Sequence, residues 1–148
     1  MRNVLLIGAG RSSSYLIQYL LEHAPEGKWT LTVADVTEEN AKQKIGNHPS
    51  GNAIRFDIQD EKLLHAEVMK SDLVISMLPA HMHLPVAREC VRQKKDLVTA
   101  SYVTKEMMDL DSEAKANGIL ILNECGLDPG IDHMSAMKLI DDIRNNGG

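Results

Sequence analysis

The order of strand, turn and helix signals at the N-terminus most constrains how this chain can fold. Residues 4–7, Val-Leu-Leu-Ile, are a short run that is apolar throughout, as in a strand covered on both faces of a sheet. The run breaks at Gly8 and Gly10, and apolar residues then recur at helical spacing from Tyr15 to Leu20. A buried strand, a glycine turn and a helix start predict the first βα unit of a parallel sheet.

The glycine turn is expected to bind phosphate. Gly8 permits backbone angles that a side chain would oppose, and Gly10 lets the main chain approach a pyrophosphate at the positive end of the helix. The predicted loop continues through Arg11, Ser12 and Ser13. Ser13 replaces the usual third glycine, but its small side chain still permits close strand–helix packing. An ordinary strand–helix turn would explain the two glycines alone.

A carboxylate further along the chain supports the phosphate interpretation. Residues 29–34 read as a second strand, and Asp35 follows it, about 20 residues beyond the glycine turn. A carboxylate there accepts hydrogen bonds from the ribose hydroxyls of an adenosine and repels a 2′-phosphate. The spacing therefore predicts a dinucleotide site that takes NAD in preference to NADP. The alternative is that Asp35 caps the helix expected from Thr37 to Ile45.

Apolar runs and amphipathic stretches alternate to the end of the chain. Strands are expected at about 3–8, 29–35, 53–56, 73–77, 97–100 and 119–122. Helices are expected at about 11–23, 37–45, 60–69, from 84 onward, 105–117 and 132–144. This alternation predicts an α/β fold: a doubly wound parallel sheet (Rossmann) of about six strands, with helices on both faces.

Composition narrows the class of protein. The 148 residues are 43% hydrophobic and 25% charged, which is typical of one globular domain. The net charge of −5, with no clustered basic face, argues against nucleic acid or an anionic membrane as partner. No apolar stretch approaches the roughly 18 residues of a membrane span, and the N-terminal run is too short for a signal peptide.

The cysteines and histidines form no metal pattern. Cys90 and Cys125 are the only cysteines, and their spacing matches neither a disulfide framework nor a zinc site. His81 and His83 have no Cys, Asp or Glu nearby at ligand spacing, so we interpret them as loop and helix-entry residues. We therefore expect a cytoplasmic protein with reduced thiols, a small-molecule ligand and no metal.

Ligands of doubly wound sheets lie beyond the carboxyl ends of the strands. Asp57 and Ile58 follow the third expected strand and are predicted to touch the adenine edge, although Asp57 could equally be a turn aspartate. After the fourth strand, the backbone is expected to pass the nicotinamide ribose at Ser76, Met77, Leu78 and Pro79. Ser101 and Tyr102 offer hydroxyls after the fifth strand, and residues 123–133 after the sixth are dense in glycine and acids.

The last of these segments carries a resemblance. Residues 126–133 read Gly-Leu-Asp-Pro-Gly-Ile-Asp-His, and with residues 101–103 and 107–111 they resemble the glutamate-forming saccharopine dehydrogenases (saccharopine reductases). Residues 72–76 and 92–95 match as well, so the resemblance covers essentially the whole chain. It implies the N-terminal NAD(P)-binding Rossmann domain of an oxidoreductase of lysine metabolism, which interconverts saccharopine with glutamate and aminoadipate semialdehyde.

The resemblance also implies roles for particular residues. Ser101, Tyr102 and Asp128 match positions that contact saccharopine, and Asp128 or Tyr102 would move protons or hold the substrate ammonium. Members of this family have a longer chain and a second domain, and we expect a homodimer. Residues 1–130 would then be the dinucleotide-binding domain, and 131–148 the first helix leading into a substrate and dimerisation domain absent here.

Two other functions fit the sequence. One is a related dehydrogenase that joins an amino-acid-derived aldehyde to a polyamine, as in carboxynorspermidine synthesis. The other is a non-catalytic NAD-binding module, for which a chain of this length would be natural. The motifs at Ser101-Tyr102 and at 126–133 favour saccharopine.

Overall fold

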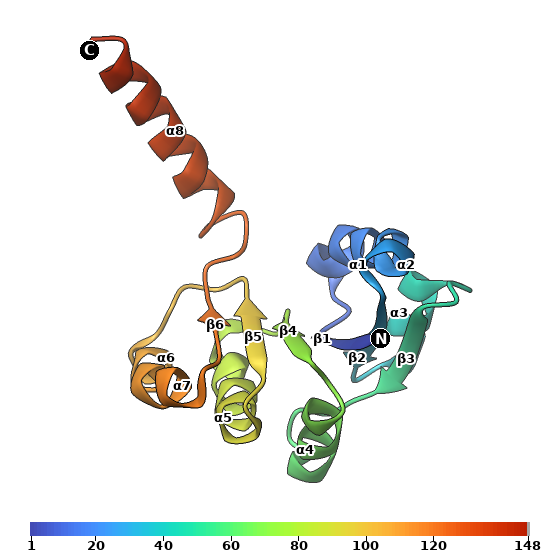
Figure 1. Cartoon of the computed structure of the whole chain (residues 1–148). Coiled ribbons are helices and arrows are strands. Elements are labelled where there is room, and N and C mark those ends of the chain that lie inside the picture. Colours follow the sequence, from blue (N-terminus) through green and yellow to red (C-terminus); the bar gives the residue numbers. More distant parts are fainter. Residues whose placement is uncertain (148) are drawn as a thin grey trace.

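The computed structural model describes residues 1–147, so residue 148, the end of the predicted segment 131–148, lies outside the described residues. The strands are β1 (Arg2–Ile7), β2 (Trp29–Asp35), β3 (Gly51–Arg55), β4 (Leu73–Ser76), β5 (Asp96–Thr99) and β6 (Ile121–Leu122). They form one sheet in the order β3-β2-β1-β4-β5-β6, in which every neighbouring pair is parallel (Figure 1). The predicted doubly wound α/β fold is confirmed.

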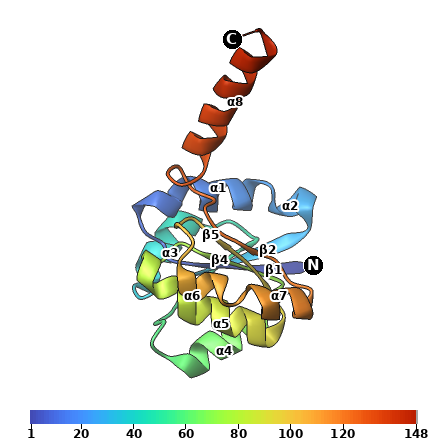
Figure 2. The ribbon, with the colours of Figure 1, turned by 90° about the vertical axis from the view of Figure 1, so that its left-hand side faces the viewer.

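Helices cover both faces of this sheet (Figure 2). On one face, α1 (Ser14–Glu22) and α3 (Glu38–Ile45) pack against Val4 and Leu6 of β1. On the other face, α4 (Glu61–Met69), α5 (His83–Gln93) and α6 (Lys105–Met108) pack against Leu5 and Ile7. Side chains alternate across a strand, so the uninterrupted apolar run of β1 serves two separate cores.

The strand order creates a crevice at the carboxyl edge. From β1 the chain crosses to β2 on one side, and it later returns to β4 on the other side of β1. The two crossovers therefore diverge between β1 and β4, which is where such sheets bind ligands. Backbone hydrogen bonds hold the two strand ends together, with Met77 N–H donating to Ile7 O at 2.8 Å.

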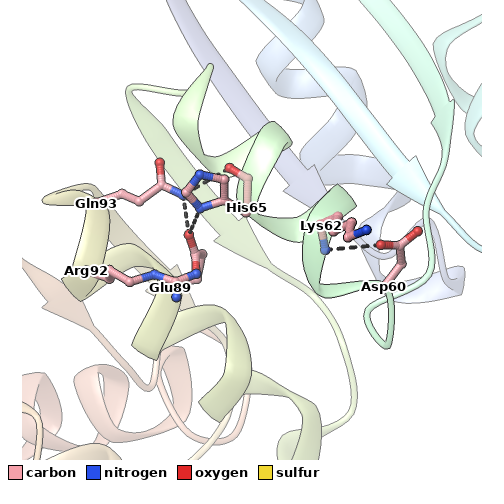
Figure 3. Close-up of polar contacts among 6 residues, drawn as sticks. All are labelled: Asp60, Lys62, His65, Glu89, Arg92 and Gln93. Carbon is pink, nitrogen blue, oxygen red and sulfur yellow. Dashed lines mark hydrogen bonds and ion pairs between the residues drawn. The ribbon is translucent and has the colours of Figure 1, made fainter.

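Polar contacts fix α4 and α5 below this edge (Figure 3). The Asp60 carboxylate accepts hydrogen bonds from the backbone N–H groups of Lys62 and Leu63 at 3.1 and 3.0 Å, so Asp60 caps α4 as its sequence position predicts. From α5, the buried Glu89 side chain meets His65 of α4 at 2.8 Å. Gln93 donates to the His65 carbonyl at 2.9 Å. The two helices are thus joined where His65 of α4 meets Glu89 and Gln93 of α5.

The predicted helix at 105–117 is wrong in one respect, because the chain breaks it into α6 and α7 (Asp111–Asn117). The Thr104 side chain caps α6. Leu110 N–H then donates to Met107 O at 3.2 Å, a tight turn between the helices. Met107 and Leu110 both pack into the same core. Gly118 ends α7 in the left-handed region at φ 69°, as expected of a C-terminal cap.

Other boundaries differ by a few residues. A short helix, α2 (Ala24–Gly27), was not expected, and Lys28 ends it in the left-handed region. The helix expected from residue 11 begins as a 3₁₀ turn, η1 (Arg11–Ser13). A second such turn, η2 (Ala80–Met82), precedes α5. β3 spans Gly51–Arg55, so Phe56 follows the strand, and β6 is shorter than predicted.

The last helix, α8 (Ile131–Asn145), agrees with the predicted 132–144 and projects away from the sheet (Figures 1 and 2). None of its residues is buried. Its large apolar side chains are exposed: Ile131, Met134, Met137, Leu139, Ile140 and Ile143. Across residues 1–147, no helix is both long enough and apolar enough to span a membrane.

A matched pair of leucine substitutions tests this packing. Leu97 of β5 is fully buried, whereas Leu139 of α8 is 62% exposed. We expect Leu97→Ala to lower the free energy of unfolding by about 2–5 kcal/mol, because it leaves a cavity under α5. Leu139→Ala should change it by less than about 0.5 kcal/mol. Urea unfolding followed by circular dichroism measures both, and equal effects would contradict the arrangement of α8.

Candidate active site

Glycine suits the two positions of the β1–α1 turn for different structural reasons. Gly8 has φ +107°, and a Cβ there would lie 2.9 Å from the backbone oxygen of Met77. A side chain is therefore excluded both by conformation and by the approach of β4. Gly10 has an ordinary φ of −67°, and an added Cβ would meet nothing within 4 Å. Gly10 instead leaves open space beside the main chain, which is what an approaching phosphate requires.

The residues after Gly10 present a helix start to that space. Arg11 and Ser12 are exposed, while Ser13 is buried and its hydroxyl donates to Gly10 O at 2.8 Å. Ser13 thus allows the close packing expected of a small residue. The first N–H groups of a helix lack intrahelical acceptors and, with the helix dipole, favour an anion.

Two oppositely charged side chains hold this loop. Asp35, at the end of β2, accepts a hydrogen bond from Ala9 N–H at 2.7 Å. Lys44, from α3, reaches the carbonyl of Gly10 and the hydroxyl of Ser13. Burial lowers the pKa of Lys44, and the negative charge of Asp35 partly opposes that shift. The loop is therefore positioned before any ligand binds.

Asp35 also acts locally. Its second oxygen accepts from Thr37 N–H at 3.0 Å and from the Asn40 amide at 3.3 Å, so it orders the entry to α3, although the N-cap of that helix is Thr37 and not Asp35. Each carboxylate oxygen has more than one acceptor direction. Two hydrogen bonds to Oδ1 and one to Oδ2 use three of about four acceptor positions, so Oδ2 keeps one position for a ribose hydroxyl.

A pocket of about 270 Å³ lies beside Asp35. Its walls include Gly8, Asp35, Val36, Asp57, Ile58 and Leu78. The structure thus brings the predicted adenine-edge residues together with Asp35. The Asp57 carboxylate accepts from Gln59 N–H at 2.9 Å, which is also the turn role considered for it. Ile58 and Leu78 pack against the core and make the wall apolar.

The side chains of the segment after β4 differ in direction, and the contact of its backbone with the nicotinamide ribose stays a prediction. Ser76 is fully buried, Met77 packs on the α1 face of the sheet, and Pro79 is exposed before η2. Since the Met77 carbonyl faces Gly8, this backbone borders the crevice between β1 and β4.

Tyr102 and Asp128 meet at the far side of the same edge. The Tyr102 hydroxyl donates a hydrogen bond to Asp128 Oδ1. That bond to a carboxylate is the main cause that raises the pKa of Tyr102 to about 12. Tyr102 is therefore a phenol at neutral pH, able to donate a proton in a hydrogen bond but poorly suited to act as a base. Both residues are exposed, so a ligand can reach them.

The loop from 126 to 133 is built by its glycines. Gly126 N–H donates to Pro129 O at 2.9 Å, and Ile131 N–H donates to Gly126 O at 3.0 Å. Gly130 has φ +147°, and a Cβ there would lie 2.1 Å from Gly126 O. Only glycine fits so tight a return.

The start of α8 gathers polar groups beside this loop. The Asp132 carboxylate accepts from Gly130 N–H at 3.0 Å and contacts His133 Nδ1 at 2.8 Å. The ligand atoms of Asp128, Asp132 and His133 lie within 4.8 Å of one another. The His133 ring lies edge-on to Tyr102, with centroids 6.4 Å apart. His133 thus makes a local contact at this turn, and the absence of a metal stays a prediction.

The sequence indicated that His81 and His83 are loop and helix-entry residues, and His83 does open α5, but its buried position was not predicted. The ring is buried, with Nδ1 2.8 Å from Ser76 Oγ and Nε2 2.8 Å from Ser101 Oγ. A signal was present, since His83, Val86 and Cys90 recur at helical spacing and all lie on the buried face of α5. His83 therefore belongs to the interior, between the ends of β4 and β5.

The strand order, the glycine turn on a helix start and the acid after β2 together define a dinucleotide-binding Rossmann domain. The family described as "Saccharopine dehydrogenase NADP binding domain" matches residues 4–122. The chain belongs to this family, and its site is that of a nicotinamide dinucleotide.

Comparisons with individual proteins agree with this family. The chain is 41% identical to the saccharopine dehydrogenase [NADP(+), L-glutamate-forming] of Pyricularia oryzae over 99% of its length and 32% of that protein. It is 47% identical to the alpha-aminoadipic semialdehyde synthase of Arabidopsis thaliana over 78% of its length and 11% of that protein. The apo saccharopine dehydrogenase (L-Glu forming) of Saccharomyces cerevisiae superposes with a TM-score of 0.86 at 36% identity, over 99% of this chain and 32% of that one. The chain thus spans about a third, or less, of the length of these relatives.

The two glycines give a paired prediction. Gly8→Ala should lower the free energy of unfolding by about 1–3 kcal/mol, because it strains the backbone against Met77. Gly10→Ala should leave stability within about 1 kcal/mol of the parent and weaken NAD binding about tenfold or more, because its methyl group occupies the phosphate approach. Thermal unfolding and calorimetric titration separate the two effects. Unaltered NAD binding by Gly10→Ala would contradict the assigned loop.

The Tyr102–Asp128 contact gives a prediction on pH. Tyr102 should remain protonated until the pH approaches about 12, and Asp128→Asn should bring its pKa down toward the ordinary value of about 10. The tyrosinate absorbance of each variant, measured against Tyr102→Phe, follows this group alone. Asp132→Asn is the control and should have a smaller effect, because Asp132 acts on Tyr102 only through its charge. An unchanged titration in Asp128→Asn would show that the two side chains are apart.

Proposed function

We propose that this chain is the cofactor-binding part of an oxidoreductase that acts on the CH–NH group of saccharopine and yields glutamate and aminoadipate semialdehyde. One observation carries the proposal. The phosphate loop, the end of β4 and the loops bearing Ser101, Tyr102 and Asp128 all lie at the carboxyl edge of one sheet. The identity to glutamate-forming saccharopine dehydrogenases over 99% of the chain supports the choice of substrate.

The reaction needs few groups from the protein. A bound nicotinamide dinucleotide supplies the hydride acceptor. The substrate nitrogen must first be a neutral amine, so that its lone pair can form the C=N bond as hydride leaves the adjacent carbon. Water then adds to that carbon, and the C–N bond breaks to release the amine of glutamate and the aldehyde. Saccharopine, water and the oxidised cofactor thus give glutamate, semialdehyde, reduced cofactor and one proton.

Asp128 and Tyr102 are suited to binding the substrate nitrogen. A carboxylate near a substrate ammonium binds and orients the charged form, from which a proton must be lost before hydride leaves, and we assign this binding role to Asp128 in preference to that of sole base. Tyr102 donates to Asp128 and so holds its orientation. Because its pKa is raised, Tyr102 remains protonated throughout the neutral range. Ser101, on the neighbouring strand end, is assigned to the substrate as well.

For the cofactor, we propose a preference for NAD. The names of the family and of its fungal relatives carry NADP, so the support for NAD comes from Asp35 and its neighbours. The next residue, Val36, is exposed and uncharged, and Lys44 is directed at the loop carbonyl of Gly10. Like charges 4 Å apart in water repel by about 1 kcal/mol. A doubly charged 2′-phosphate beside Asp35 would therefore bind roughly thirtyfold more weakly.

Titration with both cofactors tests this function. We expect NAD to bind at least about tenfold more tightly than NADP. Asp35→Asn should bring the two affinities together, because it removes the charge but keeps an acceptor for Ala9 N–H. Asp57→Asn is the control, since Asp57 lies in the same pocket and is expected to leave the ratio unchanged. Isothermal calorimetry gives all the affinities. Tighter binding of NADP by the parent chain would overturn the NAD preference, and binding of neither would overturn the proposed function.

Helix α8 supports a further domain. Its apolar side chains are exposed and the relatives are about three times longer, so we propose that residues from 131 onward lead into a substrate and dimerisation domain. The 148-residue chain alone is then expected to bind NAD weakly and to turn over no saccharopine. The homodimer and the cytoplasmic location stay predictions.

A further inference from the structure

A buried histidine links the cofactor side of the crevice to the substrate side. His83 opens α5 and is 3% exposed, with its ring between the ends of β4 and β5. Nδ1 lies 2.8 Å from the hydroxyl of Ser76, and Nε2 lies 2.8 Å from the hydroxyl of Ser101. Ser76 is fully buried and Ser101 is half-buried at the rim. The three side chains form one chain of hydrogen bonds from the interior to the ligand edge.

The protons in this chain can be placed by counting donors and acceptors. Within residues 1–147, the Ser76 hydroxyl has His83 Nδ1 as its side-chain partner and no other acceptor. If Nδ1 carried the ring proton, the hydroxyl proton of Ser76 would be buried without an acceptor, at a cost of about 1–3 kcal/mol. Ser76 therefore donates to Nδ1.

The state of the ring then follows. Burial lowers the pKa of His83, and the neighbouring His81 lowers it further, so the ring is neutral at physiological pH. A neutral imidazole carries one proton. Since Nδ1 accepts from Ser76, that proton is on Nε2, which donates to Ser101 Oγ. The proton of the Ser101 hydroxyl is thereby left free.

We propose that His83 is a positioning residue that fixes the Ser101 hydroxyl as a hydrogen-bond donor toward a carboxylate of the amino-acid substrate. The choice of ligand rests on the proposed function. An ammonium group only donates hydrogen bonds, so a free hydroxyl proton at this rim matches the carboxylate end of an amino acid. The Asp128 carboxylate, hydrogen-bonded to Tyr102, matches the ammonium end. The loops that follow β5 and β6 would thus bind groups of opposite charge on one substrate.

Nitrogen NMR of the histidine rings tests the proton placement in this chain. With ¹⁵N-labelled histidine, long-range proton–nitrogen correlations show which ring nitrogen carries hydrogen, and loss of one signal set in His83→Gln assigns His83 among the six histidines. We expect a single tautomer with the proton on Nε2. Ser76→Ala should turn it into a mixture, and Ser101→Ala should shift Nε2. Ser71→Ala, which removes another buried serine hydroxyl, should shift neither nitrogen.

A proton on Nδ1, or Nε2 unmoved in Ser101→Ala, would overturn the proposal. The double variant Ser76→Ala/His83→Gln gives a second check. Its Gln amide can replace the Nε2–H donor, and with the Ser76 hydroxyl removed no buried donor is left without an acceptor. Its stability should exceed that of His83→Gln alone. Equal stability of the double and single variants would contradict the hydrogen bond that Ser76 donates to His83 Nδ1.

The carboxylate contact is tested by adding saccharopine to the NAD-saturated protein that carries the proposed substrate domain together with this chain. We expect the His83 Nε2 signal to shift in the parent chain and not in Ser101→Ala. If NAD binds but saccharopine moves no His83 signal, the carboxylate contact is wrong. If NAD does not bind, the proposed function fails by itself, and the tautomer measurement still decides the role of His83.

Discussion

The pairing of β1 with both β2 and β4 is the constraint on which the rest of the structure depends. A strand with parallel neighbours on each side and helices over both faces has no solvent-facing side, which is why residues 4–7 are apolar without alternation. With β1 in this place, the chain after it must turn away sharply while β4 approaches from the other side. Gly8 lies where both demands meet, with its Cα facing the Met77 carbonyl. The crevice that binds ligand is thus a consequence of strand order.

Charge organises the loop that this turn creates. Asp35 and Lys44 contact consecutive residues of the loop, Ala9 and Gly10, from β2 and α3. The Asp35 carboxylate accepts from the Ala9 N–H group and the Lys44 ammonium donates to the Gly10 carbonyl, so each charge meets the oppositely charged end of a backbone dipole. A loop held in this way loses little conformational entropy when a dinucleotide binds. Under the proposed preference for NAD, the residue that orders the loop, Asp35, would also disfavour a 2′-phosphate, so loop order and cofactor choice would be coupled at one residue.

Local signals in the sequence predicted most of the architecture. Apolar runs located the strands to within a few residues, and Asp60 and Gly118 marked helix ends because their capping chemistry is local. The break between α6 and α7 was not predictable in this way. Residues 105–117 have helical composition throughout, and it is the packing of Met107 and Leu110 into one core that bends the chain. β6 was predicted too long because residues 119–120 are apolar, although the paired register with β5 begins only at Ile121.

The sequence by itself determined the fold class, the glycine turn after β1, the acid after β2 and the family of the chain, because the signals for each lie in residues close together along the chain. Only the tertiary structure decided which side chains from different strand ends meet. Tyr102 and Asp128 lie 26 positions apart, and their contact depends on β5 and β6 being neighbours. The position of His83 between Ser76 and Ser101 depends on α5 packing beneath β4 and β5. Its hydrogen bonds, and hence its proton, are set by burial between two strands, and no spacing within its own helix encodes that.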